Sequence, residues 1–550
     1  MASIGFSKRK GWNNYHLTVR NDVDEYGVFD ASELGPCDIP SPLAGPERFQ
    51  RTKGPLHDYI AKALAQDTPA GMLGTAWSFA DLVGHHDVEL DLTGLKGCSI
   101  AAQANLDAAC TIDPSEIAFV SGGTTLRCLT EWAAKLRPAR SIATSGTHLG
   151  PTIAGGFGTA SHGSRLGFGG LQDMILGLHL IVSETESVWI EPARSPVLDP
   201  SVAARFALNF IRDDDMFDDV LIHLGGMGLV NGVALRLVPY QLYDVLAEVR
   251  PLWPEWPELV EQGRYREIAD RLGHDAEPCF YECTIDPFDG AGERNAIHLM
   301  YFPAGKVAAP PDAEDIGPLP RAADAIAGMV GTVLAGAAAK LETAEIAAPP
   351  FSAFAYYEQI FSSLYKPFRL PIIAASPKLG WEKLHQDVIT GNLPGALYNA
   401  SYAVERQSFG EALKLIIEAA DGLMPSFIYT VRFVTKQAGT LAFTRFRENA
   451  VIEIDGVSDH APPQVRRWGV QTKAGAMAIR AAFDNANLDY SMHWAKLGQL
   501  DAPKIAADYD TPPLAASPAA RWRTARTKLL KTPELQAIFT NKALQFYGLI

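Results

Sequence analysis

The stretch from Ser145 to Ser164 constrains the fold of this chain more than any other. It reads Ser-Gly-Thr-His-Leu-Gly-Pro-Thr-Ile-Ala-Gly-Gly-Phe-Gly-Thr-Ala-Ser-His-Gly-Ser. Its glycines and small hydroxyl residues follow no period that would bury one face of a helix or a strand, so we expect a long loop. Loops of this length are usually functional, and glycine lets backbone N–H groups approach a flat or anionic ligand. The alternative is a glycine-rich turn that serves only the fold.

The overall composition is that of a folded, acidic protein. The chain has 550 residues, of which 47% are hydrophobic and 20% are charged, as is ordinary for globular proteins. Its 48 Lys and Arg residues against 63 Asp and Glu residues give a formal net charge of −15. Because this charge repels phosphate backbones and anionic lipid, we expect neither a nucleic-acid partner nor a membrane partner.

Neither the cysteines nor the apolar stretches indicate secretion or membrane insertion. The cysteines show no zinc-type spacing and no dense framework, so we expect reduced, mostly buried thiols. They are Cys37, Cys98, Cys110, Cys128, Cys279 and Cys283. The most apolar stretch, at 325–339, has about 15 residues against the ~20 that cross a bilayer, and we expect a buried helix there. With no apolar signal stretch after the N-terminus, we expect a cytoplasmic protein.

The hydrophobic pattern predicts an α+β fold. Glycine-punctuated apolar runs predict strands in the first half, and a helix follows a cap at Thr124 or Thr125. The expected strands of this half lie at 88–92, 117–120, 175–182, 188–190 and 232–238. In the second half we expect strands at 279–285, 296–302, 397–404, 427–434 and 450–454, and a helix at 409–420.

Two segments look like connections. Residues 239–259 interleave prolines with Trp253 and Trp256, which predicts a rigid link between domains. Residues 501–520 are rich in proline and alanine and look disordered, and the basic stretch at 521–539 predicts a helical region.

Several familiar catalytic patterns fail. We find no Gly-x-Ser-x-Gly elbow, no His-Glu-x-x-His helix and no phosphate-binding P-loop. Residues 225–232 resemble a dinucleotide fingerprint, but that motif requires a following helix and residues 233–238 continue as a strand. The acidic stretch at 213–219 suits a cation, although such a run is more often a solvated face, and we expect no metal.

Three glycine loops, in their order and spacing, resemble the PCMH-type FAD-binding domain of the vanillyl-alcohol oxidase superfamily, specifically its aldonolactone and alditol oxidase branch. The loops lie at 74–79, 121–126 and 152–164. Residues 402–405, 431–432 and 493–496 resemble motifs of the substrate domain of this branch. The resemblance extends from about residue 65 to about residue 500.

The resemblance implies a bound FAD, with its pyrophosphate over 74–78 and its isoalloxazine against 155–163. It also implies that an alcohol carbon gives a hydride to the flavin while a cation stabilises the developing alkoxide. Arg432 and Lys496 are the candidates for that cation, and His493 is a weaker third. The residues expected to bind FAD are Gly74, Thr75, Ala76, Trp77, Ser78, Ser145, Gly146, Ile153, Gly155, Gly156, Thr159, Ser161, His162, Gly163, Gly228 and Val230.

Two positions depart from the family pattern. Trp77 stands where members with covalent flavin have a histidine, so the resemblance implies a non-covalent FAD. Thr430 stands two residues before Arg432, where the family often has a carboxylate, so the substrate need not be a simple sugar alcohol.

We therefore expect a two-domain α+β flavoprotein. The FAD-binding domain is expected at 1–245, a sheet-based substrate (cap) domain at 246–480, and at 481–550 a segment that completes the active site and packs on the FAD domain. The expected activity is FAD-dependent oxidation of a CH–OH group in a small-molecule substrate, with oxygen or an electron carrier as acceptor. The alternatives are a dehydrogenase that does not use oxygen and a flavin-binding or biosynthetic protein without this activity. The pattern leaves the substrate open, and also whether the protein is a homo-oligomer.

Overall fold

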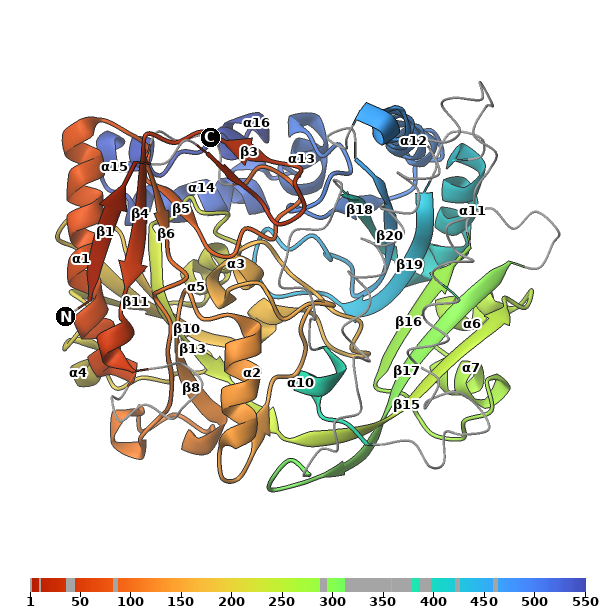
Figure 1. The fold of residues 1–550 in the computed structure, drawn as a ribbon, viewed down its shortest axis with the longest axis horizontal. Coiled ribbons are helices and arrows are strands. Elements are labelled where there is room, and N and C mark those ends of the chain that lie inside the picture. The colour runs from red at the N-terminus through yellow and green to blue at the C-terminus, as the bar shows by residue number, and fades with distance from the viewer. Residues whose placement is uncertain are drawn as a thin grey trace.

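A seven-stranded antiparallel sheet forms one end of the molecule, and two smaller sheets with helix α1 (Gly45–Gln66) form the other end (Figure 1). The computed structural model describes residues 2–8, 11–35, 45–82, 88–286, 294–311, 358, 378–385, 397–420, 426–458 and 463–550. The helix expected at 325–339 lies outside these residues.

The smaller sheets build the N-terminal half. The first has the order β1 (Ser3–Ser7), β4 (Glu25–Asp30), β6 (Val88–Asp91) and β5 (Gly71–Leu73). The second has the order β12 (Asn209–Arg212), β11 (Ser187–Glu191), β10 (Ile175–Ile181), β13 (Leu229–Arg236), β8 (Ile117–Ser121) and β7 (Cys98–Ile100). Every residue of β8, β10 and β11 is buried, and α1 packs on β8, β10 and β13. The strands expected in this half are confirmed.

Short elements connect these sheets. Helix α2 (Leu126–Lys135) begins where expected, because Thr125 accepts a hydrogen bond from the N–H of Cys128. The others are the pair β2 (Trp12–Asn13) and β3 (Arg20–Asn21), the pair β9 (Arg140–Ser141) and β14 (Val238–Pro239), and the helices α3 (Ile153–Gly158), α4 (Pro200–Ala203) and α5 (Asp214–Leu221).

The large sheet is built from the second half of the chain. Its order is β15 (Gln241–Pro251), β17 (Asn295–Lys306), β16 (Phe280–Ile285), β19 (Ser426–Thr435), β20 (Glu448–Val457), β18 (Leu397–Glu405) and β21 (Tyr490–Met492). Around it lie α6 (Trp256–Glu261), α7 (Tyr265–Arg271), α10 (Trp381–Leu384), α11 (Phe409–Ala420) and α12 (Pro463–Asn485). The strands and the helix expected here are confirmed.

The expected link at 239–259 is wrong. These residues form β14, β15 and α6, and β15 pairs with β17 along its full length. The prolines lie at or near the ends of these elements, where a missing N–H costs little. Val245 and Leu246, in the middle of β15, are buried.

The expectation of disorder at 501–520 is also wrong. The C-terminal region folds into α13 (Ala502–Tyr509), α14 (Pro518–Leu529), α15 (Pro533–Ile538) and α16 (Lys542–Phe546). Two of these helices begin with proline directly after a capping side chain, which is Ser517 in α14 and Thr532 in α15. In α13, which Asp501 caps, proline is the second residue of the helix. A proline in the first turn starts a helix rather than preventing it, because its N–H would be unpaired there anyway.

The carboxylates of the acidic stretch at 213–219 cap a helix and pair with arginines. Asp213 caps α5, and other carboxylates of this stretch pair with Arg194 and Arg521. Among the described residues, no group of three potential metal ligands lies together.

Cys128 forms a disulfide, so the expectation of reduced thiols is wrong for this residue. Spacing along the chain does not show which cysteines meet in space.

No helix in the described part of the chain is long and apolar enough to cross a membrane.

Trp522 tests how strongly the C-terminal helices stabilise the fold. Its side chain is fully buried and donates a hydrogen bond to the carbonyl of Ile222 across the contact between α14 and α5. Trp522→Ala should lower the free energy of unfolding by about 3–5 kcal/mol, because it removes a large buried side chain and leaves a cavity. Urea unfolding measures the loss. Phe546→Ala, at a side chain that is 63% exposed, is the control and should change the free energy of unfolding by less than about 1 kcal/mol. Equal losses in the two variants would contradict a stabilising role for the packing of α14 on α5.

Candidate functional site

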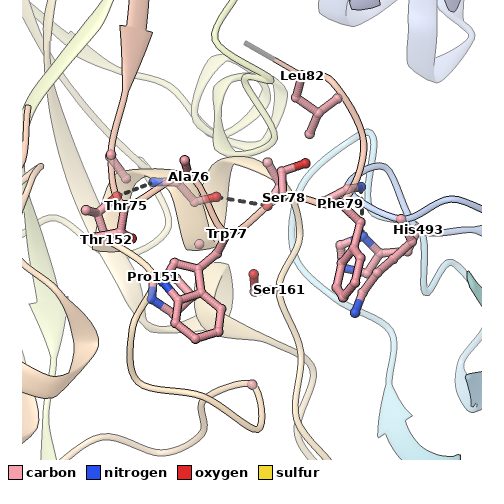
Figure 2. Close-up of a pocket in the computed structure, with 18 of the residues that line it drawn as sticks. Thr75, Ala76, Trp77, Ser78, Phe79, Leu82, Pro151, Thr152, Ser161 and His493 are labelled. Atoms are coloured by element: carbon pink, nitrogen blue, oxygen red, sulfur yellow. Dashed lines mark hydrogen bonds between the residues drawn. The ribbon is translucent and has the colours of Figure 1, made fainter. Parts of the chain in front are cut away.

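A cavity of about 370 Å³ lies between the glycine loops of the N-terminal half and one face of the large sheet. Figure 2 shows residues 75–82 running along its wall, with Pro151 and Thr152 at one end of this loop and His493 at the other. The segment at 538–541, just before α16, also lines the cavity. The cavity therefore joins parts of the chain that are hundreds of residues apart.

The glycine-rich stretch that dominates the sequence forms one wall, and it contains a helix. Thr152 caps α3 by accepting a hydrogen bond from the N–H of Gly155 at 3.3 Å, so the expected uninterrupted loop is wrong over Ile153–Gly158. Ile153 is buried in the core, whereas Gly155 and Gly156 line the cavity. A Cβ on Gly163 would lie 2.3 Å from the carbonyl oxygen of Ser145, so only glycine allows these two segments to approach so closely.

The loop at 74–79 forms a second wall and is tied to the segment that carries Lys496. The N–H groups of Phe79 and Ala80 both donate to the carbonyl oxygen of Ala495, at 2.9 and 3.1 Å. The Trp77 ring stacks on Tyr15, with 3.8 Å between ring centroids, and lies 5.2 Å from the ring of His148.

A set of polar side chains covers the third wall, which is one face of the large sheet. Strand register explains the set, because residues two apart on a strand share a face and cross-strand partners lie side by side. Glu282 pairs with Arg432, Thr430 with Glu453, and Asn399 with Asp455. We call these six residues the polar floor, and all six line the cavity.

Arg432 is held by protein groups on every side. Its Nε donates to Glu282 at 2.8 Å, its Nη1 lies 2.9 Å from Oε2 of Glu453, and its Nη2 donates to Oγ1 of Thr147 at 2.5 Å. Burial would lower the pKa of Arg432, but Glu453 and Glu282 hold it above its ordinary value. Arg432 is therefore a fixed positive charge.

Glu453 is the centre of this network. Ser401 donates to its Oε1 at 3.1 Å, and Nζ of Lys496 and Nε2 of His162 each lie 3.8 Å from the same oxygen. Burial would raise the pKa of Glu453, but the charges of Arg432 and Lys496 lower it to about 2. Glu453 therefore stays ionised and is a weak base.

Asp455, two residues along the same strand, has the opposite character. Burial and the neighbouring charge of Glu453 raise its pKa to about 6. Its Oδ1 accepts a hydrogen bond from Nδ2 of Asn399 at 2.5 Å, and no described residue donates to its Oδ2. It is a carboxylate that gains and loses a proton near neutral pH.

His162 and His493, the two histidines expected at the site, are both neutral. Burial lowers the pKa of His162 to about 4 and holds that of His493 well below its usual range. Nδ1 of His493 accepts the N–H of Ala495 at 3.0 Å, so its proton lies on Nε2.

Most of the residues expected to form the site come together on this cavity. Its lining includes Gly74, Thr75, Ala76, Trp77, Ser78, Gly146, Gly155, Gly156, Thr159, Ser161, His162, Val230, Arg432, His493 and Lys496. Ser145, Ile153, Gly163 and Gly228 lie behind the lining, where Ser145 accepts a hydrogen bond from Trp381 and Gly228, at φ +101°, packs against the carbonyl of Ile181.

The sequence interpretation missed the carboxylates of the polar floor and the N-terminal residues at the cavity. Glu282, Glu453 and Asp455 were not candidates, and neither was His16. The alternation Glu453-Ile454-Asp455 within an apolar strand is a signal that could have found two of them.

No protein-family model matches the chain. L-gulono-1,4-lactone dehydrogenase of Mycobacterium tuberculosis is 27% identical over 184 residues, which is 34% of this chain and 35% of that protein. The aligned stretch thus spans about a third of the curated relative.

Solved structures resemble the whole chain. Cholesterol oxidase of Brevibacterium sterolicum matches at a TM-score of 0.65 and 15% identity, covering 99% of this chain and 97% of that one. A VAO-type flavoprotein of Myceliophthora thermophila matches at 0.54 and 11%, covering 90% and 78%. 6-Hydroxy-D-nicotine oxidase of Arthrobacter nicotinovorans matches at 0.51 and 12%, covering 88% of each chain.

Glu453→Gln tests the charge network. The variant leaves the buried Arg432 without one of its two carboxylates, so the free energy of unfolding at pH 7 should fall by about 3–5 kcal/mol. Because the folded protein depresses the pKa of Glu453, its contribution is complete above the ordinary value of 4.5 and is lost as the pH falls toward about 2.

The difference between wild type and variant should therefore shrink when urea unfolding is repeated at pH 3.5. Glu418→Gln, which removes the exposed partner of Lys414 on α11, is the control and should cost less than about 1 kcal/mol at both pH values. A Glu453→Gln loss that is the same at pH 7 and pH 3.5 would contradict the depressed pKa.

Proposed function

Since the chain has the VAO-type flavoprotein fold that its glycine loops implied, we propose that it binds FAD and is an FAD-dependent oxidoreductase acting on a CH–OH group. The observation that carries the proposal is that glycine loops and a floor of paired charges line one and the same cavity. When bound, FAD supplies the acceptor for a hydride from the substrate carbon.

The walls of the cavity fit such a cofactor. The backbone N–H groups of residues 74–78 donate to no acceptor in the described part of the chain, although these residues line the cavity. Unpaired N–H groups in a glycine-containing loop form a site for an anion, as a pyrophosphate requires. At Gly155 and Gly156 the neighbouring wall carries no side chain, which leaves room for a flat ring system.

Lys496 is the cation that we propose for the reacting oxygen. Its Nζ reaches the cavity 3.8 Å from Glu453 and 4.8 Å from the centre of the Phe79 ring. Arg432 uses Nε, Nη1 and Nη2 on Glu282, Glu453 and Thr147, so its part is to position the floor. His493, as a neutral donor at Nε2, orients the substrate.

Asp455 is the proton acceptor that we propose. Oxidation of an alcohol removes a hydride from carbon and a proton from oxygen, and the proton needs a base. Glu453 is too weak a base for this role, because its pKa is about 2. His162 and His493 are weak bases as well, because burial lowers the pKa of each. Asp455, with a pKa of about 6 and Oδ2 facing no described donor, takes the hydroxyl proton on that oxygen.

The floor favours a small polar substrate. A buried carboxyl group without polar contacts is costly, and Oδ2 of Asp455 faces no described donor. A sterol of the kind named for cholesterol oxidase would therefore satisfy less of the floor than a substrate with several hydroxyl groups. A hydroxylated compound or lactone, as named for the M. tuberculosis dehydrogenase, offers the donors and acceptors that the floor needs.

That relative, as a dehydrogenase, also favours an electron carrier over oxygen as the electron acceptor. Stopped-flow mixing of reduced protein with oxygen separates the two by the rate at which the flavin is reoxidised.

The flavin should be released on denaturation. Trp77 stands at the position where a flavin-linked histidine is expected in members with covalent flavin. Its ring stacks on Tyr15 and has no nucleophilic atom for a flavin bond. After acid precipitation of the yellow protein, the colour should remain in the supernatant, as absorbance near 450 nm shows. Colour retained in the pellet would contradict a non-covalent cofactor, and a colourless protein that takes up no added FAD would overturn the proposed function.

Variants of the floor should separate cofactor binding from chemistry. Lys496→Met and Asp455→Asn should retain FAD but slow its anaerobic bleaching by the best substrate of a panel of alcohols, sugars and lactones, each by about 10²-fold or more. Asp270→Asn, on the exposed helix α7, should bleach at the wild-type rate. In wild type the rate should rise with pH through about pH 6, as Asp455 loses its proton, and this rise should vanish in Asp455→Asn. Equal loss of flavin and rate would assign these residues to folding instead.

A further inference from the structure

A short N-terminal hairpin packs against the loop proposed to hold the FAD pyrophosphate. Three donors of this hairpin, which we define as residues 12–21, bind three carbonyl oxygens of the loop. The N–H of Tyr15 donates to the carbonyl of Ala76 at 2.9 Å. Nδ2 of Asn14 donates to the carbonyl of Ser78 and Oγ1 of Thr18 to that of Phe79, both at 2.7 Å.

The hairpin is itself rigid. Oδ1 of Asn14 accepts the N–H of Val19 at 2.9 Å, and its Nδ2 also donates to Oγ1 of Thr18 at 2.8 Å. Asn14 and Thr18 are 3% and 5% exposed, so these bonds are shielded from water. A single side chain, that of Asn14, thus closes the hairpin and binds the loop.

Aromatic rings join the hairpin to the loop as well. The His16 ring stacks on Phe79 with 3.6 Å between centroids and 11° between planes, and Tyr15 stacks on Trp77 at 3.8 Å and 14°. Burial holds the pKa of His16 well below its usual range, so the stacked ring is neutral. The hairpin therefore contacts both the backbone and the side chains of the loop.

These contacts sort the polar groups of the loop into two sets. The carbonyls of residues 76, 78 and 79 are used by the hairpin, whereas the N–H groups of residues 74–78 donate to no described residue, and these residues line the cavity. The loop is half-buried, where an N–H without an acceptor is costly to the extent that water does not reach it, so contacts from outside the loop favour this arrangement. Without the hairpin, the loop could turn and pair its own N–H and carbonyl groups.

We propose that the hairpin at 12–21 is part of the cofactor site, with Asn14 and Thr18 as positioning residues that keep the N–H groups of 74–78 turned toward the FAD pyrophosphate. Neither residue lines the cavity, so neither would touch the cofactor. The inference rests on the proposed function, since it assigns the loop to FAD.

The test is the affinity of apoprotein for FAD, measured by quenching of flavin fluorescence. Thr18→Val keeps the shape of the side chain but removes the donor to Phe79 and the acceptor for Nδ2 of Asn14. Asn14→Ala removes the donor to Ser78 and the bonds that close the hairpin, so each variant loses one hydrogen bond to the loop. Because one hydrogen bond is worth about 0.5–1.5 kcal/mol, each should raise the Kd about 3- to 10-fold, and the double variant about 10- to 100-fold. Thermal melting of each apoprotein shows whether it folds, and Thr18→Val alone serves if the double variant does not.

Thr130→Val is the matched control. Thr130 is buried like Thr18, and it donates to the carbonyls of Leu126 and Arg127 within its own helix, α2, at 2.9 and 3.0 Å. Thr130 itself does not line the cavity and makes no hydrogen bond to the loop at 74–79. It should lower the melting temperature of the apoprotein while leaving the Kd for FAD within about twofold of wild type.

The outcomes separate the two proposals. If wild type binds FAD and the hairpin variants bind it equally well, with only their melting temperatures lowered, the hairpin serves the fold alone and this inference is wrong. If wild type itself binds no FAD, the proposed function fails first. A weakened Kd in both hairpin variants, with no change in Thr130→Val, supports the positioning role.

Discussion

Backbone N–H groups need acceptors, and one wall of the cavity is a half-buried loop whose N–H groups at 74–78 donate to no described residue. Residues 74–78 can keep this conformation because the carbonyls of Ala76 and Ser78 accept hydrogen bonds from the N-terminal hairpin and because Ala495 accepts the next two N–H groups. These residues line the cavity. The proposed anionic cofactor would accept hydrogen bonds from these donors, and its binding would then stabilise the loop.

In the polar floor, neighbouring charges stabilise one another in the same way. Arg432 pairs with both Glu453 and Glu282 in a buried network, which would contribute little to stability compared with apolar packing. The network has a consequence for its neighbour, because the fixed charge of Glu453 helps to raise the pKa of Asp455. A carboxyl group kept in an environment that disfavours its charge is typical of a functional site rather than of a structural one.

The sequence predicted the walls of the site better than its floor. Glycine loops break hydrophobic periodicity, so they stand out along the chain, and the strands around them were found for the same reason. Asp455 and Glu453 meet Asn399 and Thr430 only through strand register, which no local pattern records. The C-terminal helices were mistaken for disorder because capped prolines resemble a linker. The domain boundaries at 245 and 480, the cytoplasmic location and the oligomeric state stay predictions.

One backbone atom links the two halves of the site. The carbonyl of Ala495 accepts from Phe79 and Ala80 on the proposed cofactor loop, and the next residue is Lys496, whose ammonium approaches Glu453. A displacement of the loop therefore moves the peptide that carries the proposed catalytic cation. The hairpin that holds this loop also stacks His16 on Phe79, directly beside that link. Cofactor placement and the position of Lys496 are thus set by one connected group of contacts, and a change in the hairpin should be felt on both sides of the cavity.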